Sequence, residues 1–259
     1  MGATFDFSGH KVLVTGASRG IGYSVAEAFA AAGAELTILA DDERVREAAA
    51  KLTEKAARPV RGLVCDITDR AAVTEVLVPF DRIDVLVNNA GLERLTPLQD
   101  ADPAIDDTFA RVMAVNVTGT HNVTRAAISK IPDGGRIVVT SSIWGKTAVP
   151  DFSAYVSSKH ALIGMTRTWA KELGLRAITV NAVCPGWVKT DAAMRSLHVM
   201  AEKTGKQPDA LLEEIVAAQA IGGLMEPADV AGLYLFLASD AAANITGQAI
   251  NVDRGEVPA

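Results

Sequence analysis

Three consecutive pieces of sequence decide the fold of this chain: Lys11-Val-Leu-Val-Thr15, then Gly16-Ala-Ser-Arg-Gly20-Ile-Gly22, then Tyr23-Ser-Val-Ala-Glu-Ala-Phe-Ala30. The first piece predicts a buried strand, and the apolar spacing of the third predicts an amphipathic helix. Glycines at a strand–helix junction let the backbone turn tightly and approach a pyrophosphate, whose charge then faces the helix N-terminus. The alternative is a tight turn without a ligand, but the flanking strand and helix favour nucleotide binding.

The rest of the chain repeats this alternation of strand and helix. Apolar runs such as Ile83-Asp-Val-Leu-Val87 alternate with Ala-rich helical segments, which predicts βαβ units and a parallel sheet covered on both faces. Farther along, the pattern predicts helices over about 103–130 and 153–173, strands over 136–141 and 178–183, and a helix–strand pair at 227–239 and 248–252. We therefore expect residues 1–259 to form a single α/β domain with a doubly wound parallel sheet.

The composition is typical of a soluble globular protein. The net charge is −6 and Lys and Arg are not clustered, so nucleic acid is not an expected partner. Residues 1–11 contain no apolar segment of signal-peptide length, and no apolar stretch is long enough to span a bilayer. We expect a cytoplasmic protein without a metal site, in which Cys65 and Cys184 are buried free thiols.

Ser142, Tyr155 and Lys159 form the candidate catalytic group. Tyr155 and Lys159 are one helical turn apart in a predicted helix, so their side chains lie on one face. A lysine ammonium in that position favours ionisation of the phenol, whose pKa would otherwise be ~10. Ser142 ends a predicted strand, where open α/β sheets place ligands, and could hold a substrate oxygen while Tyr155 exchanges a proton. The alternative is an ordinary surface Tyr–Lys pair beside a strand that ends in serine.

Motifs along nearly the whole chain resemble those of the short-chain dehydrogenase/reductase family. They are Thr15-Gly-Ala-Ser-Arg-Gly-Ile-Gly22, Cys65-Asp66-Ile67, Asn88-Asn-Ala-Gly91, Val115-Asn116-Val117, Ser142, Tyr155-Val-Ser-Ser-Lys159, Pro185-Gly-Trp-Val-Lys-Thr190 and Gly247-Gln-Ala-Ile-Asn-Val-Asp253. The resemblance implies a Rossmann-fold oxidoreductase with a nicotinamide cofactor. It also implies a catalytic tetrad of Asn116, Ser142, Tyr155 and Lys159. In that tetrad Tyr155 is the general acid/base, Lys159 also holds the nicotinamide ribose, and Asn116 supports a water that relays protons.

The resemblance further implies where the cofactor is held. Asp66 would contact the adenine, Asn88 the adenosine side, and residues 185–190 the carboxamide. The predicted contacts are Gly16, Ser18, Arg19, Gly20, Ile21, Gly22, Asp41, Asp66, Ile67, Asn88, Ala90, Gly91, Tyr155, Lys159, Pro185, Gly186, Val188 and Thr190. Three of these residues could instead have purely structural roles. Asp66 could cap the next helix, and Asn88 could form a turn in which Gly91 supplies a positive φ. Asn116 has poor helix propensity in a predicted helix, so a bend around the water relay is expected there.

The choice between NAD and NADP depends on the end of the second predicted strand, which reads Leu39-Ala40-Asp41-Asp42. A carboxylate there can accept a hydrogen bond from a ribose 2′-hydroxyl and would repel a 2′-phosphate. Two features favour NADP: family members that prefer NAD usually carry the acid at the position of Ala40, and Arg19 resembles a residue that binds the phosphate of NADP. We predict NAD, with NADP as the alternative, because no basic residue at the strand end supports Arg19.

The segment at about 190–225 is the longest between predicted strands, and we expect it to be a substrate lid. Its length and its entrance resemble those of the 3-hydroxybutyrate dehydrogenases. Where those enzymes carry glutamine, histidine and lysine, however, this chain has Arg94, Trp144 and Phe152. Arg94 could bind an anion, and Trp144 and Trp187 could form apolar walls for a sugar ring, or all three could serve solvation and packing. The predicted substrate-binding residues are Arg94, Ser142, Trp144, Phe152 and Trp187.

The predicted function is hydride transfer between NAD and a secondary alcohol or ketone on a sugar, polyol or hydroxy acid. One alternative is an NADPH-dependent 3-oxoacyl-thioester reductase, which the glycine loop resembles. Another is a non-catalytic dinucleotide-binding regulator, although the intact Ser142, Tyr155 and Lys159 argue against it. We also expect a homotetramer with interfaces at helices 103–130 and 153–173 and at the C-terminal strand, because apolar residues lie on more than one side of the second helix.

Overall fold

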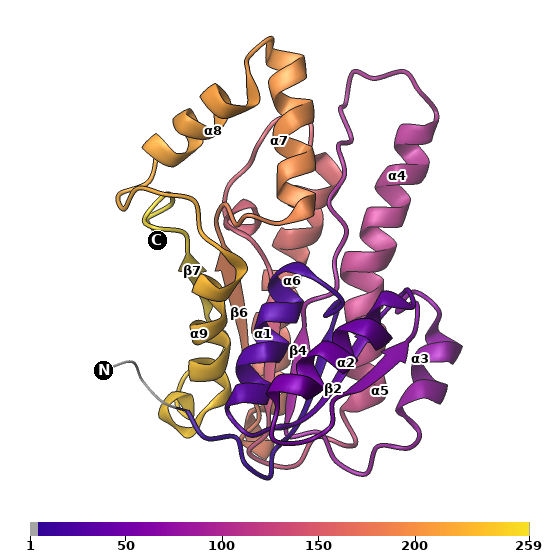
Figure 1. Cartoon of the computed structure of the whole chain (residues 1–259). Coiled ribbons are helices and arrows are strands. Elements are labelled where there is room, and N and C mark those ends of the chain that lie inside the picture. Colours follow the sequence, from indigo (N-terminus) through magenta and orange to yellow (C-terminus); the bar gives the residue numbers. More distant parts are fainter. Residues whose placement is uncertain (1–4, 259) are drawn as a thin grey trace.

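A parallel sheet forms the centre of the molecule in the computed structural model, which describes residues 5–258 (Figure 1). Its strands are β1 (Lys11–Thr15), β2 (Glu35–Ala40), β3 (Arg61–Val64), β4 (Val85–Asn88), β5 (Arg136–Thr140), β6 (Thr179–Pro185) and β7 (Ala249–Val252). They lie in the order β3-β2-β1-β4-β5-β6-β7, and every neighbouring pair is parallel. The predicted α/β fold with a doubly wound sheet is therefore confirmed. Residues 1–4, part of the N-terminal stretch expected to lack a targeting signal, lie outside the described residues.

Helices cover both faces of this sheet. They are α1 (Gly20–Ala31), α2 (Arg44–Lys55), α3 (Arg70–Leu77), α4 (Ala104–Met113), α5 (Thr120–Ala127), α6 (Ser153–Leu173), α7 (Asp191–Thr204), α8 (Pro208–Ala217) and α9 (Pro227–Ala238). Helices α1, α2 and α9 pack on one face, and α3, α5 and α6 pack on the other. Along β1, Val12 and Val14 enter the first of these cores and Leu13 enters the second, so the strand is buried on both sides as its apolar run predicts.

The direction of the winding reverses at β1. From β1 the chain passes outward through β2 and β3, and it then returns to place β4 on the other side of β1. The segments that follow β1 and β4 therefore diverge, which opens a crevice at the carboxyl ends of the strands. Helices α7 and α8 lie beyond this end of the sheet, at the top of Figure 1.

The helix predicted over 103–130 is not a continuous α-helix. It consists of α4, a π-helix at Ala114–Gly119 and α5, and it ends at Ala127. The π-helix contains Asn116, where the sequence predicted a bend. Helix α6 has the predicted bounds, whereas β6 begins and ends later than the predicted strand at 178–183.

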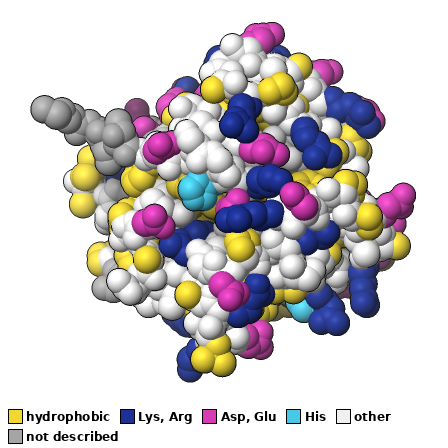
Figure 2. All heavy atoms as spheres, turned by 90° about the horizontal axis from the view of Figure 1, so that it is seen from below, with side chains coloured by type: hydrophobic (Ala, Val, Ile, Leu, Met, Phe, Trp, Pro, Cys, Tyr) yellow, Lys and Arg dark blue, Asp and Glu magenta, His cyan; other side chains and the backbone are white. Residues whose placement is uncertain are grey.

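Three further observations concern the cysteines, the helices and the surface. Cys65 and Cys184 are buried and free, as predicted. None of the helices formed by residues 5–258 combines the length and apolar character that crossing a membrane requires. Figure 2 views the molecule from the side opposite α7 and α8, and on that face Lys and Arg side chains are interspersed with Asp and Glu.

Candidate active site

A cavity of about 820 Å³ opens at the carboxyl ends of the strands. Its lining comes from the segments that follow β1, β2, β3, β4, β5 and β6, together with Tyr155 and Lys159 from α6. Because β2 and β6 lie on opposite sides of the switch point, the cavity extends from the glycine loop to the Tyr–Lys pair. The described structure thus brings the two sequence motifs into one site.

The glycine loop is built for close backbone approach. Gly16 has a φ of +65°, and a Cβ there would lie 2.5 Å from the Cα of Ala90. A Cβ on Gly22 would lie 2.3 Å from the side-chain nitrogen of Asn89. Arg19 precedes α1 but its side chain does not cap the helix, so the N–H groups of the first turn remain available to an anion. Ser18, Gly20 and Ile21 complete the loop's share of the lining.

Asn89 lines the cavity, whereas the predicted Asn88 does not. Its side-chain amide donates to the carbonyl oxygens of Thr15 and Gly16, each at 3.1 Å, and so ties the β4 segment to the glycine loop. Asn88 is buried, donates to Thr124 at 2.9 Å and does not line the cavity. The predicted contact of Asn88 with the cofactor is therefore corrected, because successive side chains at a strand end point to opposite sides. Ala90 and Gly91 do line the cavity, but Gly91 does not have the positive φ that was considered.

The end of β2 carries two acids with different surroundings. Asp41 is exposed and lines the cavity. Asp42 accepts hydrogen bonds from the guanidinium of Arg44, which holds its pKa below the usual value, and Arg19 lies 3.9 Å away. Contrary to the prediction, a basic residue does lie at this strand end beside Arg19. It is Arg44, the first residue of α2, which begins soon after the strand ends.

Asp66 lines the cavity together with Cys65 and Ile67. Its carboxylate accepts from the backbone and side chain of Thr68 and from Arg111 at 3.0 Å. The considered role of Asp66 as a helix cap is wrong, because Asp69 caps α3 by accepting from the N–H groups of Ala71 and Ala72. Asp66 thus remains available at the wall, fixed by Thr68 and Arg111.

Ser142, Tyr155 and Lys159 all line the opposite part of the cavity. Lys159 is buried, its ammonium lies 5.3 Å from the centre of the Tyr155 ring, and it donates to the carbonyl oxygen of Thr140 at 2.9 Å. The Ser142 hydroxyl accepts from the backbone N–H of Trp144 at 3.1 Å, which leaves its proton free for another acceptor. The sequence order strand, serine, helix therefore brings three side chains with exchangeable protons together at the cavity.

Burial dominates the acid–base properties of this pair in the protein alone. It raises the pKa of Tyr155 above its usual value, and the negative charge of Glu93 adds to the rise, whereas Ser142 acts against it. Burial also lowers the pKa of Lys159 to about 8. The expected lowering of the Tyr155 pKa by the Lys159 ammonium is therefore not met in the protein alone, because burial of the phenol raises its pKa instead.

Asn116 lies behind the cavity wall and is fully buried. Its side chain accepts from the N–H of Leu92 at 2.7 Å and donates to the carbonyl oxygen of Leu92 at 3.0 Å. It also donates to the hydroxyl of Ser158 at 2.9 Å. Asn116 therefore fastens the segment after β4 to α6, a structural task that the sequence analysis did not identify.

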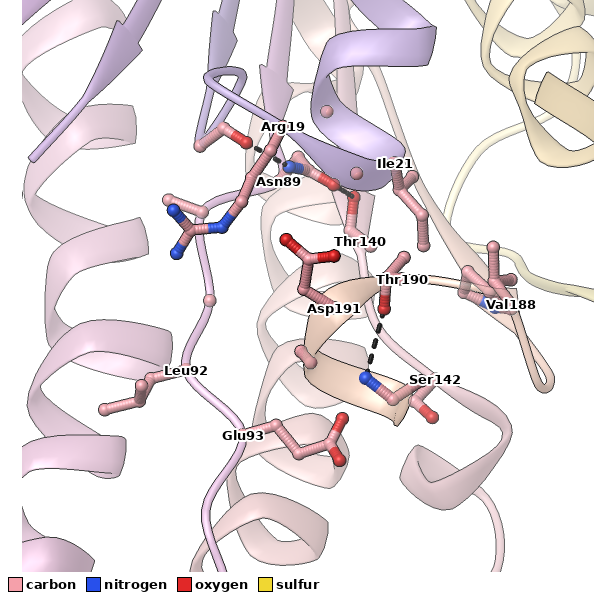
Figure 3. A pocket seen from close by; sticks show the side chains of 18 of the residues that line it. Arg19, Ile21, Asn89, Leu92, Glu93, Thr140, Ser142, Val188, Thr190 and Asp191 are labelled. Carbon is pink, nitrogen blue, oxygen red and sulfur yellow. Dashed lines mark hydrogen bonds between the residues drawn. The ribbon is translucent and has the colours of Figure 1, made fainter. Parts of the chain in front are cut away.

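Glu93 is the site residue that the sequence analysis missed. Its carboxylate points from the segment after β4 toward the side of the cavity that carries Ser142 (Figure 3). Burial raises its pKa, and Ser196, Lys159, Arg195 and Arg94 act in the opposite direction. Arg94 reaches only the rim, where its exposed guanidinium donates to the carbonyl oxygen of Glu93 at 2.7 Å. The sequence does contain a sign of this residue. Glu93 is a charged residue two positions after Gly91, and it adjoins Arg94, which was predicted instead.

Two tryptophans form the wall beside Tyr155. The ring of Trp144 lies edge-on to Tyr155 at 6.0 Å and to Trp187 at 5.9 Å. Phe152 packs against Trp144 at 5.2 Å but is fully buried and does not line the cavity. Its predicted contact with the substrate is corrected to support of Trp144, because α6 begins directly after it and turns it into the core.

The segment after β6 passes along the cavity as predicted. Pro185, Gly186, Val188 and Thr190 all line it. Thr190 caps α7 by accepting from the N–H of Ala193 at 3.2 Å, and the N-terminus of α7 therefore begins at the cavity (Figure 3). The predicted lid consists of α7 and α8, whose apolar cluster includes Trp187 and Leu197.

Comparisons with known proteins agree with this geometry. Residues 16–256 match the family model described as enoyl-(acyl carrier protein) reductase. The D-beta-hydroxybutyrate dehydrogenase of Cupriavidus necator is 31% identical over 259 residues, which cover 96% of this chain and 98% of that protein. The 3-oxoacyl-[acyl-carrier-protein] reductase FabG of Thermotoga maritima is 36% identical over 260 residues, with 96% and 98% covered. The crystal structure of NAD⁺-bound xylitol dehydrogenase is 32% identical and has a TM-score of 0.87, over 95% of this chain and 98% of that one.

The matches extend over nearly the whole chain, from the glycine loop to the C-terminal strand. The matched residues include those that line the cavity, Tyr155 among them. The chain therefore belongs to the short-chain dehydrogenase/reductase family, as an oxidoreductase that works with a nicotinamide cofactor.

Proposed function

We propose that this protein oxidises a secondary alcohol, or reduces the corresponding ketone, on a small polar substrate, with NAD as its preferred cofactor. The substrate class is a sugar, a polyol or a hydroxy acid. The observation that carries the proposal is the convergence of Ser142, Tyr155 and Lys159 on a cavity that the glycine loop also lines. A protein that only binds a dinucleotide has no need for a phenol and an ammonium at that place.

The cavity suits a dinucleotide by its own shape. At Gly16 and Gly22 a side chain would collide with Ala90 and Asn89, so glycine lets the loop lie close to the segment after β4, and the N-terminus of α1 supplies unpaired N–H groups to a pyrophosphate. Lys159 would hold the nicotinamide ribose and Asp41 the 2′-hydroxyl of the adenosine ribose. When bound, NAD supplies the acceptor for the hydride. Asp41 supports NAD because it is exposed at the cavity and has no cation bound to it among the described residues.

Tyr155 performs the proton transfer. In the oxidative direction its phenolate takes the proton of the substrate hydroxyl, while Ser142 donates a hydrogen bond to the same oxygen. Burial opposes formation of the phenolate in the protein alone. The ammonium of Lys159, 5.3 Å from the ring centre, is the cation that stabilises it.

The test is a panel of secondary alcohols and ketones assayed with NAD and NADP through nicotinamide absorbance. We expect turnover of at least one polyol, sugar or hydroxy acid, with a higher kcat/KM for NAD than for NADP. Tyr155→Phe should abolish turnover and leave the dissociation constant of NADH within a few-fold, because the ring remains and only the exchangeable proton is lost. Retention of more than about a tenth of the activity would refute the role of Tyr155.

A second candidate is an NADPH-dependent 3-oxoacyl-thioester reductase. The observation that favours it is the pair of arginines, Arg19 and Arg44, beside the end of β2, because both could turn toward a 2′-phosphate. The FabG relative supports the same candidate. Inclusion of an acetoacetyl thioester with NADPH in the panel separates the two functions.

A further inference from the structure

Glu93 is a charged side chain at the reactive end of the cavity, and the proton transfer does not use it. It lies on the segment that Asn116 fastens through both polar backbone atoms of Leu92. Its position is therefore fixed by the fold rather than by a flexible loop. It is close enough to Tyr155 and Lys159 for its charge to shift the pKa of both groups.

The carboxylate of Glu93 has unused capacity to accept hydrogen bonds. An ionised carboxylate offers about four acceptor positions. Ser196, a buried residue of α7, acts most strongly against the rise in pKa that burial causes in this carboxylate. Across the described residues no Lys or Arg side chain lies within 4.0 Å of this carboxylate, and Arg94 is turned to a backbone carbonyl instead. A partly buried carboxylate that faces a cavity with acceptor positions to spare can take a hydrogen bond from a ligand or from water.

We propose that Glu93 selects the substrate by accepting a hydrogen bond from a second hydroxyl group, so that the protein acts on neutral polyhydroxylated alcohols and rejects carboxylates. This inference rests on the proposed dehydrogenase function. Glu93 and Ser142 lie on facing parts of the cavity, so one substrate can present its reacting hydroxyl to Ser142 and Tyr155 and another hydroxyl to Glu93 (Figure 3). The Trp144 and Trp187 rings beside them suit the C–H face of such a molecule.

Electrostatics exclude the charged alternatives. A substrate carboxylate placed beside Glu93 would meet a like charge in an enclosed, poorly solvated site, which is unfavourable. A substrate ammonium would meet Lys159 and Arg195, two cations that already act on Glu93. A neutral hydroxyl avoids both conflicts and still provides a donor to the carboxylate.

Three four-carbon substrates with the same reacting centre test the inference: butan-2-ol, butane-1,3-diol and 3-hydroxybutanoate. They differ only in whether the distant group is absent, a hydroxyl or a carboxylate. In the native protein we expect the diol to have the highest kcat/KM. Glu93→Leu should lower kcat/KM for the diol by about ten- to a hundred-fold, the loss expected when a hydrogen bond to a charged group is removed. The same change should alter kcat/KM for butan-2-ol by about two-fold or less, in the range of a substitution that makes no substrate contact.

Two further variants control the experiment. Glu93→Gln keeps the shape and removes the charge, so kcat/KM for 3-hydroxybutanoate should rise. Glu47→Gln, at an exposed position of α2 far from the lining, should leave all three values unchanged. The dissociation constant of NADH reports correct folding in each case.

Two outcomes would overturn the inference. One is a loss of equal size for the diol and butan-2-ol in Glu93→Leu, and the other is a native preference for 3-hydroxybutanoate over the diol. Failure of the proposed function looks different, because the native protein would then turn over none of these alcohols and no member of the wider panel with either cofactor.

Discussion

The side chain of Lys159 is buried, and it lines the reactive end of the cavity. Burial lowers its pKa from the ordinary 10.5 to about 8. The side chain is therefore a cation below pH 8 and becomes neutral above it. Only the cation can donate all three of its protons, one of which is bound by the carbonyl of Thr140. The remaining two are available to ribose hydroxyls and to the phenol.

This position predicts that the affinity for NADH falls as the pH rises through about 8. The sign follows from the lowered pKa, because the charged form that binds the ribose is lost on the alkaline side. Fluorescence titration of NADH between pH 6.5 and pH 9.5 measures the effect. Lys159→Met should bind more weakly at every pH and lose the dependence near 8. An affinity of the native protein that stays constant across this range would contradict the assignment.

Asp42 holds the guanidinium of Arg44 by hydrogen bonds and lies 3.9 Å from Arg19, which lines the adenosine end of the cavity. We predict that Asp42→Asn raises the ratio of kcat/KM for NADP over NAD by about tenfold, because it frees both guanidinium groups for a 2′-phosphate. Asp41→Asn should raise the same ratio by removing a like charge. If neither change alters the ratio, the cofactor preference does not reside at the end of β2. Asp209→Asn, at the start of α8, is the matched control.

At the residue scale, the sequence identified most of the wall of the cavity because each family motif fixes residue type and spacing together. Glu93 and Asn89 were not predicted as site residues, and the reason is the same for both. Each adjoins the residue that was chosen, Arg94 in one case and Asn88 in the other. In extended backbone, successive side chains point to opposite sides. A prediction that is wrong by one position therefore selects a side chain that points away from the ligand.

The element that most affects the site is the π-helix at Ala114–Gly119. Its wider turn presents Asn116 to the segment after β4. We predict that Asn116→Ala lowers kcat/KM for the substrate at least tenfold and leaves the NADH dissociation constant within a few-fold, because the segment that carries Glu93 loses its fastening. The free energy of unfolding should fall by about 1–3 kcal/mol for a buried group left without a partner. Urea unfolding and steady-state kinetics measure the two effects.

A matched variant separates positioning from stability. Asn181 is also fully buried and uses both ends of its amide, toward Ile245 and Gln248, far from the cavity. Asn181→Ala should therefore reduce stability to a similar degree without changing kcat/KM. Equal kinetic losses in both variants would show that Asn116 acts only through general stability.

At the element scale, periodicity predicted the strands and the bounds of α6 well, since each has a long apolar pattern with clear ends. It could not predict the division of the helix at 103–130. The π-helix coincides with the bonds of the Asn116 side chain to Leu92, a distant segment about which local propensity contains no information. Asn116 with its poor propensity was the only local sign.

For the whole molecule, we predict assembly into a homotetramer from the surfaces of several helices. Helix α9 is apolar around its circumference although only one side faces the sheet, and α4 leaves the ring of Phe109 40% exposed. Helix α6 has open space above the exposed Gly164. We predict a mass of about four times 27.1 kDa in sedimentation at micromolar concentration.

Gly164→Glu places a charge in the predicted interface and should lower the sedimenting mass. Gly174→Glu, at an equally open position just after α6, should not. A monomer of 27.1 kDa for the unaltered protein would refute the tetramer.

The π-helix also bears on how the coding sequence can change in length. One codon gained or lost within 114–119 would change the number of residues in the wider π turn and so change which side chain that turn presents to Leu92. Asn116 would then lose its bonds to Leu92 and release Glu93. A codon gained in the exposed stretch at 98–103 would only lengthen a loop. In descendants of this gene, the loop before α4 can therefore change in length without affecting the site. By the proposed role of Glu93, a single codon inserted directly after α4 would change which substrates the protein accepts.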